Sequence, residues 1–531
     1  MALPLLFLLN LSFLLLLSLF FLSSIHFFPT NGCHDFLSAS RCPINNKQAP
    51  CVPQGYIDYL YFFCSLSKLL HPYLVYLLLF LWLLVLFYIL GTTASLYFCS
   101  SLEGLSKLLR LSPTIAGVTL LSLGNGASDV FASIVSFSGS GAEEVGLSSV
   151  IGGAFFVSSV VVGVISITMN SRNHHSVFIE KPGFFRNISF LIIASLSLVL
   201  IIFIGQINVW TSLCFASVYV VYVFVVSTAH CCKPSKSQDQ NLIEPFINNT
   251  DEEQQQEEEE EEAGAHSSSS SSFSSSSCDN HKMNKILYIL EMPLYLPRRL
   301  TIPDVSEERW SKPMAIATVF FSPLLIAALY DSEERLTLLT VGALVGIVLG
   351  ITVVETTESS RPPNKYLLLW LCGEFLMSVI WTYMTSRELV SLLVSVGYIL
   401  GINPSMLGVT VLAWGNSAGD LMANVSLALN GGEDGVQVAI SGCYAGPVFN
   451  VLVGLGVSFL FSCIAVYPAS FEVPKSSSLL ETLGFLVGGL LWALVILPRR
   501  GMKLDRVLGV GLLAIYLCFL CVKVSVTIGL V

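Results

Sequence analysis

The feature that most constrains this chain is an apolar segment that occurs twice, once in each half, with a polar pair at the same place in both copies. The first copy, from position 113, reads P-T-I-A-G-V-T-L-L-S-L-G-N-G-A-S-D, and the second, from position 404, reads P-S-M-L-G-V-T-V-L-A-W-G-N-S-A-G-D. Asn125 and Asp129 therefore match Asn416 and Asp420. An ionisable group at bilayer depth costs about 3 kcal/mol or more on insertion scales. Two such groups in matching positions of a repeat predict one cation site built from both halves.

The composition indicates a protein that crosses a membrane many times. Hydrophobic residues make up 54% of the 531 and charged residues 12%, whereas soluble domains carry about 25% charged residues. Apolar runs of about 20 residues, the length that spans a bilayer, recur along both halves. We therefore expect an all-α polytopic membrane protein that is a transporter rather than an enzyme. Its partners would be the lipid bilayer and transported cations, with no nucleic acid.

The apolar runs and the segments between them divide the chain into six parts. They are a signal sequence or N-terminal membrane helix at 1–23, a cysteine-containing luminal or extracellular segment at 24–73, a first repeat half at 74–229, an acidic and serine-rich cytosolic loop at 230–312, two additional membrane helices at 313–355, and a second repeat half at 366–531. The loop is too polar to bury apolar area, so we expect disorder. It is either a solvated tether or a regulatory segment with partners of its own.

Basic residues predict how the helices are threaded. If residues 24–73 lie outside, Lys107, Arg110 and Arg361 fall on connections that face the cytosol, as the positive-inside rule requires. The helix that starts at position 113 then runs from inside to outside, and the helix that starts at position 404 runs from outside to inside. The sequence therefore predicts two inverted-topology five-helix repeats plus extra helices, an arrangement that permits alternating access.

Glycines flank both polar pairs, and each pair offers carboxylate and amide oxygens as possible cation ligands. Glycine in a membrane helix permits a local break or the close approach of another backbone, and the glycines concerned are Gly124, Gly126, Gly415 and Gly419. Hard oxygen ligands suit Na+, K+ or Ca2+ rather than zinc or copper, so no resident cofactor is expected. Two aspartates would balance one Ca2+ or two monovalent cations.

Cysteines near the N-terminus indicate an oxidising compartment. Four of them precede or begin the first membrane helices, and beside a secretory-type start they favour two disulfides, although free thiols are the alternative and the pairing stays open; they are Cys33, Cys42, Cys51 and Cys64. Cys231 and Cys232 follow a membrane helix and are palmitoylation candidates. The vacuolar membrane, another endomembrane or the plasma membrane would all fit such a start.

The G-N-G-A-S-D and G-N-S-A-G-D segments resemble the alpha repeats of the sodium/calcium exchanger superfamily. They look most like the plant-type cation/calcium exchanger branch, which is related to the potassium-dependent and mitochondrial sodium/calcium exchangers. The resemblance covers roughly residues 74–229 and 366–527. It implies a ten-helix exchanger core that binds ions between the second and third helices of each half. It also implies that Asp129 and Asp420 are the central acidic ligands, with Asn125 and Asn416 in place of threonines.

The chain also departs from that family pattern. Ser128 and Gly419 stand where the family has a proline, and Ser417 keeps a serine that the first repeat has lost. Of the later G-S-N-x-x-N element only Asn450 survives, and the matching first-half stretch offers only serines, namely Ser158 and Ser159. Fewer acids imply a lower cation load and leave the coupling to K+, Na+ or H+ open.

Glu374 is a further acid inside an apolar run, and it has no acidic counterpart in the first half. It is either a proton site that faces the helix bundle or a residue near an aqueous edge. With no histidine in mid-helix, proton coupling would have to use this residue or the two aspartates.

The sequence as a whole predicts a secondary active cation antiporter that exchanges Ca2+ and/or K+/Na+ against Na+ or H+ by alternating access. The alternative is a monovalent cation/H+ exchanger with little Ca2+ transport. A cation channel and an intramembrane aspartyl protease are remote alternatives. The protease normally has G-x-G-D around its second aspartate, whereas this chain has S-A-G-D, and its two aspartate segments would not be inverted copies.

Overall fold

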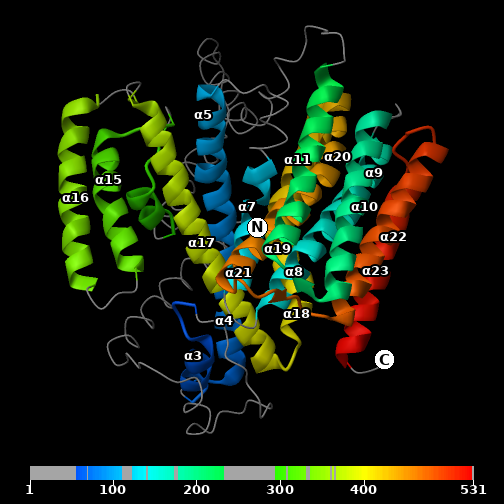
Figure 1. The fold of residues 1–531 in the computed structure, drawn as a ribbon, viewed down its shortest axis with the longest axis horizontal. Helices are drawn as coiled ribbons and strands as arrows, with labels where there is room; N and C mark the ends of the chain where they lie inside the picture. The colour runs from blue at the N-terminus through cyan, green and yellow to red at the C-terminus, as the bar shows by residue number, and fades with distance from the viewer. Residues whose placement is uncertain are drawn as a thin grey trace, which may run out of the picture.

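The computed structural model describes residues 55–68, 70–109, 122–138, 142–172, 178–231, 294–306, 309–330, 335–358, 362–363 and 366–528. The predicted N-terminal segment at 1–23, three of the four disulfide candidates (Cys33, Cys42 and Cys51), Cys232 and most of the acidic loop lie outside these residues. Figure 1 shows the described helices side by side in one bundle.

Each half contributes five membrane helices, some of them interrupted by a π-helical turn. The first half comprises α4 (Pro72–Thr93) with η1 (Ala94–Cys99) and α5 (Ser100–Leu108), α7 (Ser122–Ser138), α8 (Glu143–Phe155) with η3 (Phe156–Val161) and α9 (Val162–Arg172), α10 (Lys181–Ile204), and α11 (Val209–Cys231). The second half comprises α17 (Leu367–Leu400), α18 (Pro404–Leu407) with η6 (Gly408–Leu412) and α19 (Ala413–Asn430), α20 (Gly432–Phe449) with η7 (Asn450–Leu455) and α21 (Gly456–Ala465), α22 (Ser477–Arg499), and α23 (Arg506–Ile528). Outside the two repeats lie α3 (Tyr59–Leu66), α15 (Lys312–Leu329) and α16 (Arg335–Thr356).

Two short pairings between connections relate the halves. β1 (Gln206–Ile207), between α10 and α11, pairs antiparallel with β2 (Phe471–Glu472), between α21 and α22. At the other end of α10, Phe178 bridges Lys503, which lies between α22 and α23. Exchanging the first half for the second converts one pairing into the other and moves it to the opposite face of the bundle. The repeats are therefore inverted, as the sequence predicts.

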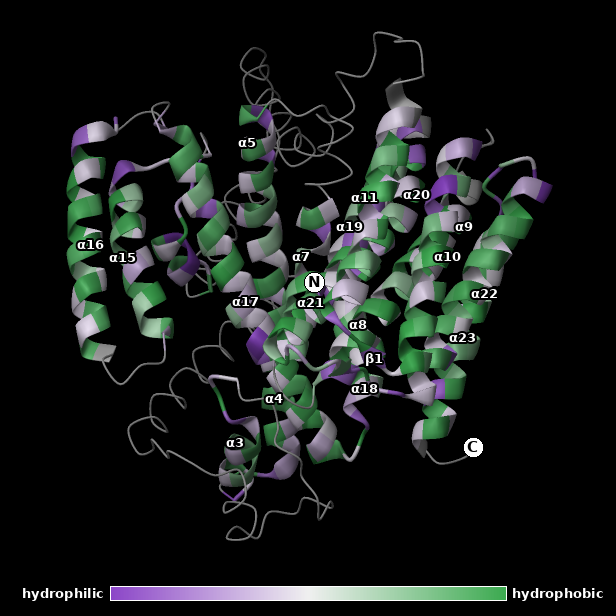
Figure 2. Ribbon diagram, viewed as in Figure 1, coloured by the Kyte–Doolittle hydropathy of each residue, from purple (hydrophilic) through white to green (hydrophobic). Residues whose placement is uncertain are grey.

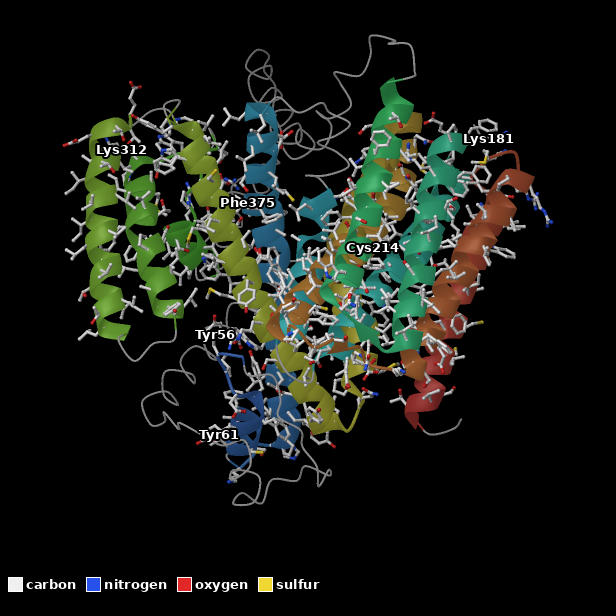
Figure 3. All side chains as sticks on the ribbon, viewed as in Figure 1. Tyr56, Tyr61, Lys181, Cys214, Lys312 and Phe375 are labelled. Carbon is white, nitrogen blue, oxygen red and sulfur yellow. The ribbon has the colours of Figure 1, made fainter. Side chains whose placement is uncertain are left out.

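The two faces of the bundle differ in what they carry. One face, here called the α3 side, holds α3 and the β1–β2 pairing; the other, here called the loop side, holds the ends of α5, α11 and α16 (Figure 1). Figure 3 shows Tyr56 and Tyr61 toward the α3 side and Lys181 and Lys312 at the loop side. Chain direction alternates between these faces from helix to helix, as a polytopic membrane protein requires.

Ten helices of the described residues are long and apolar enough to span a bilayer. The outer helices are apolar over most of their length (Figure 2). The two helices with the repeated motif, α7 and α19, are not among these ten. Both lie inside the bundle, where α7 contacts α8, α17 and η7, and α19 contacts α8 and α20. Neighbouring helices cover Asp129 on α7 and Asn416 on α19, which lets these polar side chains lie at bilayer depth.

The predicted helix break at the motif glycines is wrong. The helix α7 runs without interruption through Gly124 and Gly126, and α19 runs through Gly415 and Gly419. In the described part of the second repeat, the helices depart from α geometry at the π-helical turns η6, which precedes α19, and η7, which begins at Asn450. Single π turns inside α-helices are frequent at functional sites. Gly124, Gly126 and Gly415 instead permit close packing, whereas a Cβ on Gly419 would meet nothing within 4 Å.

The segment before the first membrane helix is docked onto α17 by a buried carboxylate. The Tyr59 hydroxyl donates to Glu388 Oε2 at 2.6 Å, the Trp82 indole N–H donates to the Tyr59 oxygen at 2.9 Å, and the Tyr56 backbone N–H donates to Glu388 Oε1. Burial and the neighbouring Glu388 charge raise the pKa of the Tyr59 hydroxyl well above its ordinary value, so Tyr59 stays a neutral donor. Cys64 on the same helix is disulfide-bonded.

Replacing Glu388 with alanine is expected to lower the free energy of unfolding by about 3 kcal/mol, because the Tyr59 hydroxyl and the Tyr56 N–H would lose a charged acceptor in a buried place. Thermal unfolding of the purified protein measures this loss. The matched control is Glu472→Ala, which removes an exposed carboxylate on the same face. Equal melting temperatures for the two variants would show that Glu388 does not hold the segment.

Candidate cation site

Three elements from both halves converge on the side chain of Asp129. It lies on α7 of the first repeat and is 3% exposed. Asn416, on α19, donates from Nδ2 to Asp129 Oδ1 at 3.0 Å, and Asn450, at the start of η7, donates from Nδ2 to Asp129 Oδ2 at 2.7 Å. Both donors belong to the second repeat. The carboxylate of one repeat is thus held by two amides of the other.

Oxygen atoms beside this carboxylate have no hydrogen-bond partner among the described residues. They are Oδ1 of Asn416, Oδ1 of Asn450 and Oγ of Ser417. All three side chains are buried, with at most 8% of their surface exposed. A buried polar atom without a partner costs about 1–3 kcal/mol. Three of them around one carboxylate form a set of hard oxygen donors, the kind that Na+, K+ and Ca2+ prefer.

Close packing around the carboxylate depends on two glycines. A Cβ on Gly126 would lie 2.1 Å from Asn450 Oδ1, so only glycine admits Asn450 to this place. A Cβ on Gly153, in α8, would lie 3.2 Å from Ser417 Oγ and 3.5 Å from Asp129 Oδ2. The Ser128 hydroxyl donates to the Asn416 carbonyl at 3.5 Å. The helices that carry the cluster are therefore in direct contact.

The two repeats are not equivalent at this cluster. Asn125, which matches Asn416, is exposed, and Asp420, which matches Asp129, is only partly buried. Asp420 lies close enough to Asp129 for their charges to interact, but no hydrogen bond joins Asp420 to Asn125 among the described contacts. The structure brings together Asp129, Asn416, Ser417 and Asn450, and it leaves Asn125 outside this group.

The remaining predicted ligands lie elsewhere. The Ser158 hydroxyl donates to the Ala154 carbonyl of its own helix at 2.7 Å. Ser159 is buried, and its Oγ would lie 3.1 Å from a Cβ on Gly489 of α22. Glu374, on α17, is fully buried and has Asp304, Arg299 and Arg309 as its charged neighbours. Of the two positions that the sequence left open for Glu374, this burial favours the one that faces the helix bundle.

The sequence analysis missed a group of buried charges at the end of the acidic loop. Arg298, Arg299 and Asp304 are at most 5% exposed, although the arginines read as ordinary cytosolic charges in the sequence. The burial of these charges could have been inferred from the run R-R-L-T-I-P-D. This run mixes charged and apolar residues just before a membrane helix.

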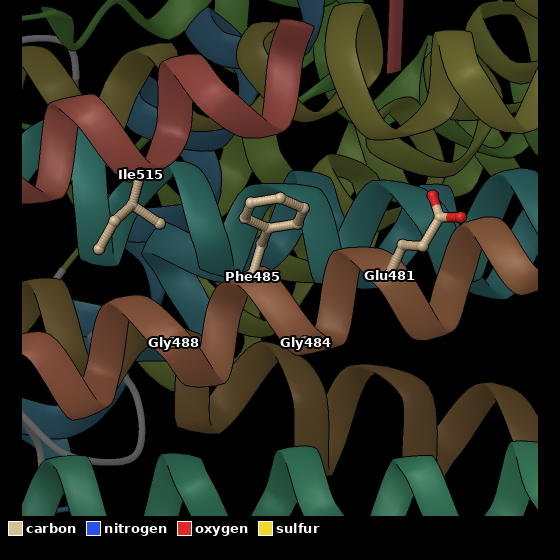
Figure 4. A pocket seen from close by; sticks show the side chains of 5 residues that line it. All are labelled: Glu481, Gly484, Phe485, Gly488 and Ile515. Atoms are coloured by element: carbon tan, nitrogen blue, oxygen red, sulfur yellow. The ribbon is translucent and has the colours of Figure 1, made fainter. Parts of the chain in front are cut away.

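A groove lies between α22 and α23, and none of its lining residues belongs to the Asp129 cluster. It is lined by Glu481, Gly484, Phe485, Gly488 and Ile515 (Figure 4). None of these residues contacts Asp129. The described residues also include no group of three or more His, Cys, Asp and Glu side chains that could hold a metal ion. The hydrogen-bond partners of Asp129 in this part of the chain are the side-chain N–H groups of Asn416 and Asn450.

The unequal placement of the two asparagines gives a direct expectation. Replacing Asn416 with alanine removes an amide that touches Asp129 and is expected to raise the half-saturating cation concentration about tenfold, the effect of about 1.4 kcal/mol. The matched change Asn125→Ala is expected to shift it less than about twofold, because Asn125 is exposed. The measurement is cation-dependent tracer uptake by each variant. Equal effects would mean that the repeats contribute symmetrically.

Known proteins match this chain over most of its length. The model of the family described as sodium/calcium exchanger protein matches residues 79–228 and 370–525. Cation/calcium exchanger 1 of Arabidopsis thaliana is 48% identical over 503 residues, which cover 92% of this chain and 87% of that protein. The mitochondrial sodium/calcium exchanger protein of Mus musculus is 29% identical over 533 residues, with 93% and 89% covered. A crystal structure of the H+/Ca2+ exchanger CAX overlaps with a TM-score of 0.47 at 13% identity, with 88% of each chain covered.

The family match covers both halves, and the two stretches it matches contain the α7 and α19 motifs described above. The match agrees with the fold described above, a multi-pass membrane protein with two inverted repeats. It also agrees with the class of cation/Ca2+ antiporters. The chain belongs to the sodium/calcium exchanger family.

Proposed function

We propose that the protein is a secondary active antiporter that exchanges Ca2+ and/or K+/Na+ against Na+ or H+ by alternating access, with the cations bound in turn at the Asp129 cluster. The observation that carries this proposal is the contact of Asp129, from one inverted repeat, with Asn416 and Asn450, from the other. A site built from both repeats can open to one face or the other when the repeats move relative to each other.

Asparagine suits a site that must accept and release a cation. Its amide offers two N–H donors and one carbonyl acceptor, and rotation of the terminal amide group exchanges their positions. With the N–H groups toward Asp129, as in this structure, the amides neutralise the carboxylate. With the carbonyl oxygens turned inward, Asn416 and Asn450 would join the Asp129 carboxylate and the Ser417 hydroxyl as ligands of one cation. The exchange of donor for acceptor needs no movement of the backbone.

Charge balance favours a small cation load. Asp129 and Asp420 together bring two negative charges, which one Ca2+ or two monovalent cations would balance. Asp420 is partly exposed, so we assign it the role of the acid that a cation or proton meets on entering, and Asp129 the role of the buried ligand. The site must be filled before its buried charge can pass through the bilayer interior, since an unbalanced charge there is costly. That requirement couples the two ion movements.

The relatives support Ca2+ as one of the transported ions, because two of them are named cation/calcium exchanger and mitochondrial sodium/calcium exchanger protein. A monovalent cation/H+ exchanger is the second candidate, and the observation that favours it is the presence of a single fully buried carboxylate in the cluster.

The experiment is uptake of radiolabelled Ca2+ into proteoliposomes that hold the purified full-length chain, with outward gradients of Na+, K+ or H+ imposed one at a time. Ca2+ uptake driven by one gradient supports the proposal and names the counter-ion. Absence of Ca2+ uptake, together with Na+ or K+ flux driven by a proton gradient, would replace it with the second candidate. Flux of no cation under any gradient would contradict both.

A further inference from the structure

The long first membrane helix is interrupted by a π-helical turn. α4 ends at Thr93, and η1 occupies Ala94–Cys99 before α5 continues the helix. The equivalent helix of the second repeat, α17, is α-helical throughout, from Leu367 to Leu400. A π turn is less favourable than the α-helix around it, so something must hold it in place.

Arg298, which lies near the end of the acidic loop in the sequence, bonds to the end of α4, where this turn starts. Residues 294–301 form a helix that immediately precedes α15, and Arg298 in it is fully buried. Its Nη1 donates to the hydroxyls of Thr92 and Thr93 and to the Ile89 carbonyl at 3.5 Å. A buried guanidinium persists only where hydrogen bonds compensate its desolvation. Here those bonds go to the last turn of α4.

A second arginine contacts the middle of the turn. Arg309 donates from Nη2 to the Leu96 carbonyl at 3.2 Å, and its guanidinium lies 5.8 Å from the centre of the Tyr97 ring. Asp304 ties the segment together, because it accepts from Arg299 at 2.6 Å and from Arg309 at 3.0 Å. The described residues of this segment therefore meet the end of α4 through Arg298 and the turn η1 through Arg309.

The opposite side of η1 faces the helix that carries Asp129. A Cβ on Gly124 would lie 2.8 Å from Cys99 Sγ, so the thiol rests against the first described turn of α7. The Phe98 and Phe131 rings meet edge-on with centroids 6.1 Å apart. Asp129 lies on this same helix, between Gly124 and Phe131. A continuous series of contacts therefore connects Arg298 to the end of α4, and η1, which follows α4, to α7.

We propose that Arg298 is a positioning residue for cation exchange. Its guanidinium holds the end of α4, from which η1 starts, and so positions η1 against α7, the helix that carries Asp129. None of the cation ligands proposed above contacts Arg298, so the residue acts on the conformational step rather than on binding. This inference rests on the proposed exchange activity, and it ties the end of the acidic loop to the ion pathway.

The first test separates rate from affinity. Arg298→Ala is expected to lower the maximal exchange rate about tenfold and to leave the half-saturating cation concentration within about twofold. Arg298→Lys keeps a buried positive donor and is expected to recover most of the rate. The matched control is Lys523→Ala, which also removes a buried cation, one bonded to Ser478 and Glu481 at the α22–α23 contact. A loss of rate in this control equal to that in Arg298→Ala would overturn the proposal, as would a change confined to affinity.

The second test does not depend on transport. N-ethylmaleimide labelling of the Cys99 peptide, followed by mass spectrometry, is expected to be about fivefold faster in Arg298→Ala than in the wild type, because the π turn is released from α7. Cys372, an exposed free cysteine on α17, is the internal reference. An unchanged Cys99 rate would refute the positioning role even if exchange is intact. Failure of wild-type exchange with faster Cys99 labelling in the variant would refute only the proposed function.

Discussion

Replacing Asp129 with asparagine is expected to lower cation exchange at least about 100-fold. Asparagine has the same shape, but it removes the negative charge that a bound cation would meet, and a hydrogen bond or ion contact to a buried charged group is worth up to about 3 kcal/mol. Asp129 is 3% exposed and holds both Asn416 and Asn450. The measurement is the initial rate of tracer uptake into proteoliposomes under the gradient that drives the wild type.

Two controls keep this prediction interpretable. Asp434→Asn makes the same chemical change at an exposed aspartate of α20 and is expected to leave the uptake rate unchanged. Thermal unfolding of Asp129→Asn should match or exceed that of the wild type, because burial of a charge is costly and the variant removes it. Uptake by Asp129→Asn within about threefold of the wild type would show that the buried carboxylate is not a ligand.

Replacing Gly126 with alanine is expected to cause the second large loss, about 30-fold in apparent cation affinity. The new Cβ would lie 2.1 Å from Asn450 Oδ1, which is far inside contact distance. Asn450 opens the π-helical turn η7 and has little room to retreat, because it is 6% exposed. Displacing it costs the cluster one amide ligand and disturbs the α7–η7 contact, an effect of about 2 kcal/mol. The dependence of uptake on cation concentration measures this change.

Gly484→Ala is the matched control for Gly126→Ala. Gly484 also lies in the middle of a membrane helix, but a Cβ there would meet nothing within 4 Å. Adding one methyl group to a membrane helix is therefore expected to leave affinity unchanged at this position. If both alanine variants behave alike, the tight contact between Gly126 and Asn450 has no functional role.

The repeat itself predicted the main features of the fold. Matching Pro, Gly, Asn and Asp residues in two apolar segments indicate two copies of one unit, and the basic residues of the connections predict their opposite directions. The contact of Asp129 with Asn416 agrees with the sequence prediction that the two motifs form one site. These conclusions require only the identity and the order of the residues, which are known directly from the sequence.

The sequence could not predict which asparagine would contact an aspartate. Asn125 and Asn416 occupy equivalent positions in the repeat, yet one is exposed and the other is buried against Asp129. Two inverted repeats around one site need not adopt the same conformation, because a transporter open to one side treats its halves differently. A pattern that is symmetric in sequence cannot indicate which half is closed.

Local geometry was also beyond the reach of the sequence. Glycine predicted a break in α7 and α19, but packing against Asn450 and Cys99 explains Gly126 and Gly124 without one. The burial of Arg298 could not be foreseen, because arginine at the end of a polar loop is usually solvated. Its acceptors, Thr92 and Thr93, are more than 200 residues away in sequence, and only the folded chain brings them together.

The central claim is that one site serves two cations in turn, and trans-stimulation of tracer uptake tests it most directly. Proteoliposomes with the wild-type protein would be loaded with unlabelled Ca2+, with the counter-ion found above, or with an impermeant buffer cation alone. The account predicts rapid uptake of labelled Ca2+ in the first two cases and almost none in the third, because a site with buried charge returns only when filled. Equal uptake in all three cases would indicate a channel and contradict the account.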